Sequence, residues 1–123
     1  MNLPLDFAVP SNFPDLAYDI TANPPTEKGF ELGKKLFYDG RLASDGLVSC
    51  GFCHLQENAF THHGHTVSHG VNDAQGTRNA PAIQNMAFQR VFMYDGASSH
   101  LDLQPIIPLT SEIEMNGDLN TIL

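Results

Sequence analysis

The residues best suited to do chemistry are the two cysteines and the histidine of residues 50–54, which read CGFCH. C-x-x-C-H is the attachment sequence of c-type haem. On one helical turn, Cys50 and Cys53 point to the same side and can reach the two vinyl groups of one porphyrin. His54 would then offer its imidazole to the iron. The chain has only two cysteines and six histidines, so this arrangement is specific and predicts a covalent haem c.

Three other chemistries fit parts of this motif. The thiols could form a thioredoxin-like redox pair, but that fold needs alternating strands and helices, which the sequence does not show. Cys50 and Cys53 could bind zinc together with His63 and His65, at a spacing that is unusual for such sites. A buried pair of structural thiols would not explain why a histidine, His54, directly follows the second cysteine.

The iron of a c-type haem needs a sixth ligand or an open face for chemistry. The candidates in the loop after the motif are His62, His63, His65 and His69. A solvated loop explains any single one of them, although the chain from His54 to His69 can extend up to about 50 Å and round the porphyrin edge. Gly70 allows the backbone to approach the ring closely. The spacing leaves the choice between His65 and His69 open.

Glu114 is a second candidate for chemistry. It lies between Ile113 and Met115, and a carboxylate among apolar neighbours is either a surface residue or a tuned acid–base group. Sequence context by itself favours the surface.

The elements that position these residues are predicted to be short helices joined by long loops. Thr26 is a suitable N-cap for a helix over 27–38, whose apolar residues recur at helical spacing. Further short helices are expected over residues 50–56, 79–88, 99–104 and 118–123. Residues 57–78 read as a long functional loop. No alternating strand pattern is present, so the predicted fold class is mainly helical.

Residues 1–25 contain five prolines and are expected to form an extended arm, leaving residues 26–123 as the domain. The last predicted helix has about one turn, which buries little surface, so we expect this chain to be the N-terminal part of a longer protein.

The chain is acidic, with 14 carboxylate residues against 6 lysines and arginines and a net charge of −8. This charge argues against nucleic acid and anionic membranes as partners and is compatible with a basic protein partner. No run approaches the ~20 apolar residues of a membrane span. The opening residues lack the features of a signal peptide, so the sequence predicts either a cytoplasmic protein or one that starts at a mature terminus.

Several short motifs occur in an order that is more specific than the haem motif alone. They are LGKKLFYD at 32–39, VSCGFCH at 48–54, SHG at 68–70, RNAP at 78–81, YDG at 94–96, LQP at 103–105 and IEM at 113–115. From about residue 24 to 118 the chain resembles the N-terminal haem domain of the bacterial di-haem cytochrome c peroxidases, in the MauG-like superfamily. The resemblance implies an all-α, cytochrome c-like domain with long loops around one covalently attached haem c.

The resemblance also implies roles for the haem-binding residues. Cys50 and Cys53 match the thioether cysteines, and His54 matches the proximal iron ligand. His69 matches the distal histidine that occupies the iron at rest and must leave before peroxide binds.

Other residues match the chemistry around the haem. Glu114 matches the distal acid–base catalyst and Gln104 a polar catalytic neighbour. Asn79 matches a residue of a calcium site between two haem domains. Tyr94 stands where the family usually has tryptophan, which puts its part in electron transfer between haems in doubt.

The activity implied is reduction of hydrogen peroxide to water in the periplasm, with electrons from a cytochrome c or cupredoxin. Family members often form homodimers and carry a second, C-terminal haem domain, which this chain lacks, so the isolated chain is expected to be weakly active or inactive. Two alternatives are an electron-transfer c-type cytochrome module and a MauG-like enzyme that oxidises a protein side chain. Because MauG-like enzymes lack the distal histidine, His69 favours the peroxidase.

Overall fold

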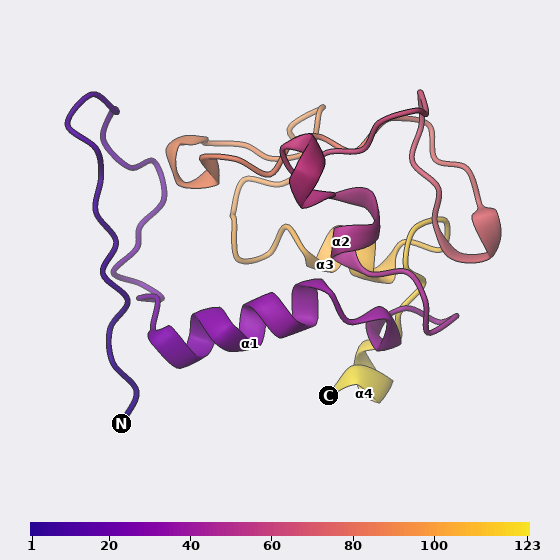
Figure 1. Cartoon of the computed structure of the whole chain (residues 1–123), viewed down its shortest axis with the longest axis horizontal. Helices are drawn as coiled ribbons and strands as arrows, with labels where there is room; N and C mark the ends of the chain where they lie inside the picture. Colours follow the sequence, from indigo (N-terminus) through magenta and orange to yellow (C-terminus); the bar gives the residue numbers. More distant parts are fainter.

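The computed structural model describes all 123 residues and contains four short α-helices. They are α1 (Glu27–Phe37), α2 (Cys50–Cys53), α3 (Ile106–Thr110) and α4 (Leu119–Ile122), shown in Figure 1. Single 3-10 turns lie at Gly40–Leu42, Gln56–Asn58, Val71–Asp73 and Met86–Phe88. Strand pairing is limited to four isolated bridges, so there is no sheet. No helix combines the length and apolar character that crossing a membrane requires.

Helix α1 forms where the sequence predicts it. The Thr26 hydroxyl accepts a hydrogen bond from the Gly29 N–H at 3.1 Å, which caps the first turn. Glu27 in the first turn and lysines in the last turn complement the helix dipole. No residue of α1 is buried, and the helix runs along one edge of the molecule (Figure 1).

The helix predicted over 79–88 is wrong, because only Met86–Phe88 form a single 3-10 turn. The Asn79 side chain accepts from the adjacent Ala80 N–H instead of capping a helix. The Ala80 carbonyl accepts from the Thr61 hydroxyl, and Asn85 is left-handed with φ 54°. These contacts give the segment an irregular path along the loop after the cysteine motif.

Two other predicted helices are displaced or shortened. Residues 99–104 form turns, and the helix begins after Pro105, whose fixed φ and missing N–H suit a helix start. The helix predicted over 50–56 ends at Cys53, because His54 leaves the helical conformation with ψ 74°. The predicted C-terminal helix is present as α4, capped by the Asp118 carboxylate.

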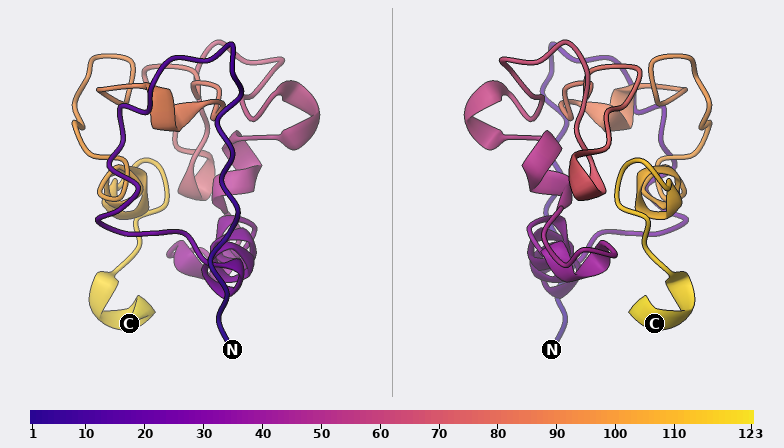
Figure 2. Two further views of the ribbon diagram at one scale, coloured as in Figure 1. Left: turned by 90° about the vertical axis from the view of Figure 1, so that its left-hand side faces the viewer. Right: turned by 90° about the vertical axis from the view of Figure 1, so that its right-hand side faces the viewer.

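Residues 1–25 contain no helix and double back beside the rest of the chain (Figures 1 and 2). The Leu5 N–H donates to the Pro25 carbonyl, closing the two ends of this segment together. Further along, the N–H groups of Ala17 and Tyr18 both donate to the Ala87 carbonyl. The Tyr18 hydroxyl donates to Asp102 at 2.8 Å, and the Glu27 N–H donates to the Leu3 carbonyl, so the segment is attached to the rest of the chain along its length.

The buried core is small and joins loops rather than helices. Ala43, Val48, Val71 and Met115 form its main cluster, with Leu109 packed against it. Of 54 backbone hydrogen bonds, 44 lie outside regular elements. Most of these bonds close local turns, and a few, such as those from Ser44 to Met115 and from Val71 to Glu114, join distant loops.

Two loops lie very close together at Gly70. A Cβ atom at this position would lie 2.5 Å from the Glu114 carbonyl oxygen and would collide with the Ile113 carbonyl. The neighbouring Val71 N–H donates to that Glu114 carbonyl at 2.8 Å. Only glycine allows the segment after His69 to lie directly against residues 113–115.

Replacing Gly70 by alanine is expected to lower the free energy of unfolding by about 2 kcal/mol or more, because the added methyl group overlaps fixed backbone. The matched control is Gly33→Ala in α1, where a Cβ meets nothing within 4 Å. That change should instead raise stability by about 0.5–1 kcal/mol. Urea denaturation followed by circular dichroism measures both changes, and equal midpoints for the two variants would contradict the close contact at Gly70.

Candidate functional site

The residues predicted to act in catalysis and cofactor binding line one cavity of about 450 Å³. α2 and its C-terminal end contribute Cys50, Cys53 and His54, and distant loops contribute His69, Asn79, Tyr94, Gln104 and Glu114. The volume falls within the range of about 300–1,000 Å³ typical of ligand and cofactor sites. The tertiary structure therefore gathers in one place residues that lie up to 64 positions apart in the sequence.

The two thiols lie one helical turn apart on α2 and are not joined by a disulfide. Burial raises the pKa of both thiols, and the negative charge of Glu114 raises that of Cys53 further. Gly51 between them is required by packing, since a Cβ there would lie 2.6 Å from the Tyr38 ring at the end of α1. α1 thus supports the outer side of α2.

His54 is oriented by a hydrogen bond to the backbone. Its Nδ1 lies 2.9 Å from the Phe60 carbonyl oxygen. A carbonyl can only accept, so Nδ1 carries the proton and Nε2 keeps its lone pair for a metal. A tight turn with Ala59 and Phe60 both at φ 58° returns this carbonyl to the histidine. Metal-ligating histidines are commonly oriented in this way.

His69 has the same kind of support from a carboxylate. Its Nδ1 lies 2.6 Å from Asp73 Oδ1, which leaves Nε2 as its second nitrogen. The backbone carbonyl of His69 is 3.6 Å from Cys53 Sγ. Asp73 was not among the predicted site residues. It lies four positions after His69, but the segment between them is not helical, because Asn72 and Asp73 are both left-handed.

The other histidines of the loop pack beside His69 without lining the cavity. The His65 ring lies 4.7 Å from the His69 ring, and the His62 ring lies 4.8 Å from the His65 ring. Burial lowers the pKa of His62. The structure thus distinguishes the two histidines, because His69 lines the cavity and His65 does not. Their spacing in the sequence left this choice open.

No three histidine, cysteine, aspartate or glutamate side chains are grouped so that they could hold a metal ion. The structure therefore provides no preformed zinc site with Cys50, Cys53, His63 and His65.

Gln104 and Glu114 lie in the same cavity and come from either side of α3. The Gln104 Nε2 donates to the Met93 sulfur at 3.3 Å. Glu114 is partly buried, and its backbone is held by the contact with Gly70 and Val71. A carboxyl group and a carboxamide therefore lie together in the cavity that the two thiols line.

Asn79 and Tyr94 lie toward the outside of this cavity. The Asn79 side chain accepts from the Ala80 N–H and donates to the His62 carbonyl, so both ends of its amide are used within the chain. Its role in calcium binding stays a prediction. The Tyr94 side chain is 88% exposed, and the Arg78 guanidinium lies 5.9 Å from its ring centre. Arg78 also donates to Asp95, which lowers the pKa of that carboxyl group.

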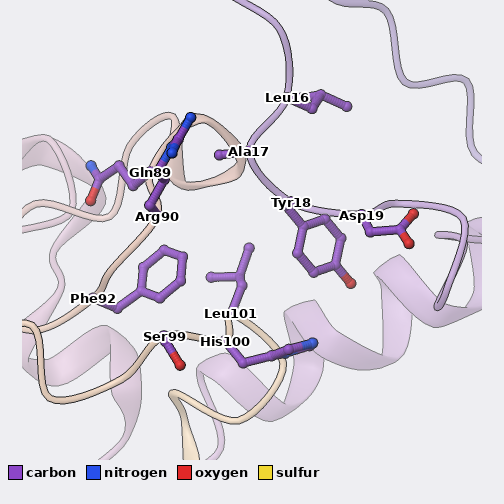
Figure 3. A pocket seen from close by; sticks show the side chains of 10 residues that line it. All are labelled: Leu16, Ala17, Tyr18, Asp19, Gln89, Arg90, Phe92, Ser99, His100 and Leu101. Carbon is purple, nitrogen blue, oxygen red and sulfur yellow. The ribbon is translucent and has the colours of Figure 1, made fainter.

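A second cavity of about 490 Å³ lies between the N-terminal segment and the loops of residues 89–101. Figure 3 shows Leu16, Ala17, Tyr18 and Asp19 on one side of it and residues such as Phe92 and His100 on the other. The Tyr18 and His100 rings meet edge to face at 6.2 Å. None of the predicted site residues lies here, so the motif chemistry belongs to the first cavity.

A sequence model of the di-haem cytochrome c peroxidase family matches residues 27–123. The chain therefore belongs to the di-haem cytochrome c peroxidase and MauG family. The match includes the cysteine motif, the SHG segment and Glu114.

The similar proteins carry both names of the family. The chain is 32% identical over 102 residues to the methylamine utilization protein MauG of Methylophilus methylotrophus, covering 83% of this chain and 30% of that protein. It is 33% identical over 109 residues to cytochrome c551 peroxidase of Pseudomonas aeruginosa, covering 85% of this chain and 30% of that protein. It is 40% identical over 90 residues to cytochrome-c peroxidase IdrP2 of Denitromonas iodatirespirans, covering 72% of this chain and 24% of that protein.

A solved structure of a MauG-like protein associated with microbial copper homeostasis shares the fold with a TM-score of 0.83 and 37% identity. The match covers 95% of this chain and 34% of that one. The chain thus spans about a third or less of the length of the relatives it matches.

The proximity of Glu114 to Cys53 can be tested in the haem-free chain. Glu114→Gln removes a negative charge, so the pKa of Cys53 falls and more thiolate is present at a given pH. Alkylation of Cys53 at pH 8 should become several-fold faster, while Cys50 serves as the internal control. Peptide mass spectrometry after iodoacetamide treatment measures both rates. Equal acceleration of both cysteines would mean that the variant has opened the cavity rather than removed a local charge.

Proposed function

We propose that this chain is the peroxidatic haem domain of an enzyme that reduces hydrogen peroxide to water with electrons from a small redox protein. The observation that carries the proposal is the composition of one cavity. The attachment residues of a c-type haem line it together with a histidine, a carboxyl group and a carboxamide from other loops. Since the chain spans about a third of its relatives, we propose that a second haem domain completes the enzyme.

The residues present fit haem c. Cys50 and Cys53 are free thiols one turn apart, and both line the cavity with His54. The His54 Nε2 is the nitrogen available to iron because Nδ1 is bonded to Phe60. Haem c bound here would supply the iron that accepts peroxide and the redox chemistry that cleaves its O–O bond.

His54 and His69 are the two histidines that would hold such a group. His54 is the proximal ligand in this proposal, and the hydrogen bond from its Nδ1 to the Phe60 carbonyl makes it a better donor. His69 is the distal ligand and is supported in the same way by Asp73. For peroxide to enter, His69 must move away, which also separates it from the His65 ring.

Glu114 is the acid–base group of the proposed reaction. A carboxylate beside bound peroxide can take the proton from the near oxygen and deliver it to the far oxygen, so that water leaves. The fixed backbone of residues 113–114 against Gly70 holds this carboxyl group near the distal histidine. Gln104 would orient the peroxide through its amide.

The wider setting follows from the family. We propose that the enzyme is periplasmic and takes electrons from a cytochrome c or cupredoxin. The whole protein would form a homodimer, as family members often do, and Asn79 would belong to a calcium site between its two haem domains. The relatives include both peroxidases and MauG proteins. The presence of His69 in the cavity favours the peroxidase over the MauG-like oxidation of a protein side chain and agrees with its proposed distal role.

Expression of the chain with haem-maturation machinery tests the cofactor and its ligands. We expect the intact mass to increase by one haem and the absorption spectrum to be low-spin. His69→Ala should convert the spectrum to high-spin, because the sixth ligand is lost. The control His65→Ala should keep the low-spin spectrum, since His65 lies beside His69 but does not line the cavity. Absence of a covalent adduct would contradict the proposal.

The role of Glu114 is tested on the haem-loaded chain by stopped-flow mixing with peroxide. Glu114→Gln should slow the spectral change by about 10²–10⁴-fold, the usual contribution of a positioned acid–base group. Glu112→Gln is the matched control, because Glu112 is an exposed carboxylate two residues away that does not line the cavity. Similar rates for the two variants would exclude Glu114 as the proton carrier.

A further inference from the structure

Met93 places a thioether in the cavity, and the proposed peroxide chemistry does not use it. Its side chain is partly buried and lines the cavity together with Gln104 and Glu114. The sulfur accepts a hydrogen bond from Gln104 Nε2 at 3.3 Å. A thioether beside a peroxide site is a chemically reactive group, because peroxide oxidises methionine readily.

The backbone around Met93 is held in place by its own hydrogen bonds. Phe92 is buried and exchanges backbone hydrogen bonds with Ser98 in both directions. The Met93 carbonyl accepts from the Gly96 N–H, and Met93 itself is left-handed with φ 65°. This closed turn fixes the starting point of the Met93 side chain at the cavity.

We propose that Met93 is the methionine of this chain that hydrogen peroxide oxidises to the sulfoxide while it occupies the cavity. This inference rests on the proposed function, which brings peroxide to Glu114 and Gln104. In the step, the sulfur lone pair attacks one peroxide oxygen, an S–O bond forms and the O–O bond breaks. The proton on the transferred oxygen moves to the leaving oxygen, so water departs. Sulfur loses two electrons and peroxide gains them.

Gln104 is positioned to stabilise the product. A thioether sulfur is a weak hydrogen-bond acceptor, whereas a sulfoxide is a polar group whose oxygen accepts strongly. The Gln104 N–H that now points to sulfur would therefore bind the new oxygen more strongly. Oxidation would also draw the Gln104 amide away from peroxide. The sulfoxide at Met93 would record past turnover, and a methionine sulfoxide reductase could reduce it back to methionine.

The other methionines provide internal controls. Met1 is fully exposed and reports the reaction with peroxide in bulk solution. Met86 is partly buried, like Met93, but does not line the cavity. Met115 does line the cavity, but it is only 4% exposed in the core. The decisive comparison is therefore between the oxidation rates of Met93 and Met86.

The experiment treats the haem-loaded chain with a few equivalents of peroxide, stops the reaction with catalase and measures sulfoxide by peptide mass spectrometry. Met93 should be oxidised at least about tenfold faster than Met86, which general exposure would not produce. In the haem-free Cys50→Ser/Cys53→Ser chain this ratio should fall toward one. Gln104→Leu should lower the ratio in the loaded chain, and Met86→Leu should leave Met93 oxidation unchanged.

The outcomes separate this inference from the proposed function. If the loaded chain consumes peroxide but oxidises Met93 no faster than Met86, the inference is overturned and the proposed function stands. If the loaded chain does not consume peroxide, the proposed function fails and the inference fails with it. A similar Met93 preference in the haem-free chain would show ordinary exposure to bulk peroxide and would also overturn the inference.

Discussion

The contact between Gly70 and the backbone of residues 113–114 is the constraint on which the cavity depends. A side chain at residue 70 would overlap two carbonyl groups, and the adjacent Val71 N–H bonds to one of them. Because this contact is backbone to backbone, it has little freedom to adjust. It places His69 and Glu114 in one cavity although 44 residues separate them in the chain. Every proposed step that involves both groups requires it.

The two histidines of the site show a second constraint, which acts on their rings. Each has its Nδ1 held by an acceptor from the following loop, Phe60 for His54 and Asp73 for His69. In both loops the chain uses left-handed residues to turn back on the histidine. The same arrangement is therefore built twice, and in each case the hydrogen bond engages Nδ1 and not Nε2.

The helices themselves contribute less to this site than the loops. α1 buries none of its residues and supports α2 through the packing of Tyr38 against Gly51. The small core gathers Val48, Val71 and Met115 from three loops that border the cavity. A site made in this way is sensitive to the packing of its loops, and a bound prosthetic group would add contacts to all of them.

Local sequence determined the parts of this protein whose physics is local. The Thr26 cap and the helical spacing of apolar residues were sufficient for α1, and the spacing of Cys50, Cys53 and His54 was sufficient for the haem hypothesis. The ordered motifs identified the family, which the comparisons confirm. The haem-binding and catalytic roles that the family resemblance implies remain predictions, although all of the residues concerned line the cavity.

Only the tertiary structure decided which residues meet. The helix predicted from Asn79 does not form, because its side chain and the Ala80 carbonyl are used by other contacts, one of them with a residue almost twenty positions away. Where the loops cross determines that His69 lines the cavity and His65 does not. It also determines the hydrogen bond between His69 and Asp73 and the one between Gln104 and Met93. Sequence patterns report periodicity and caps within one element, whereas these contacts join segments that no period relates.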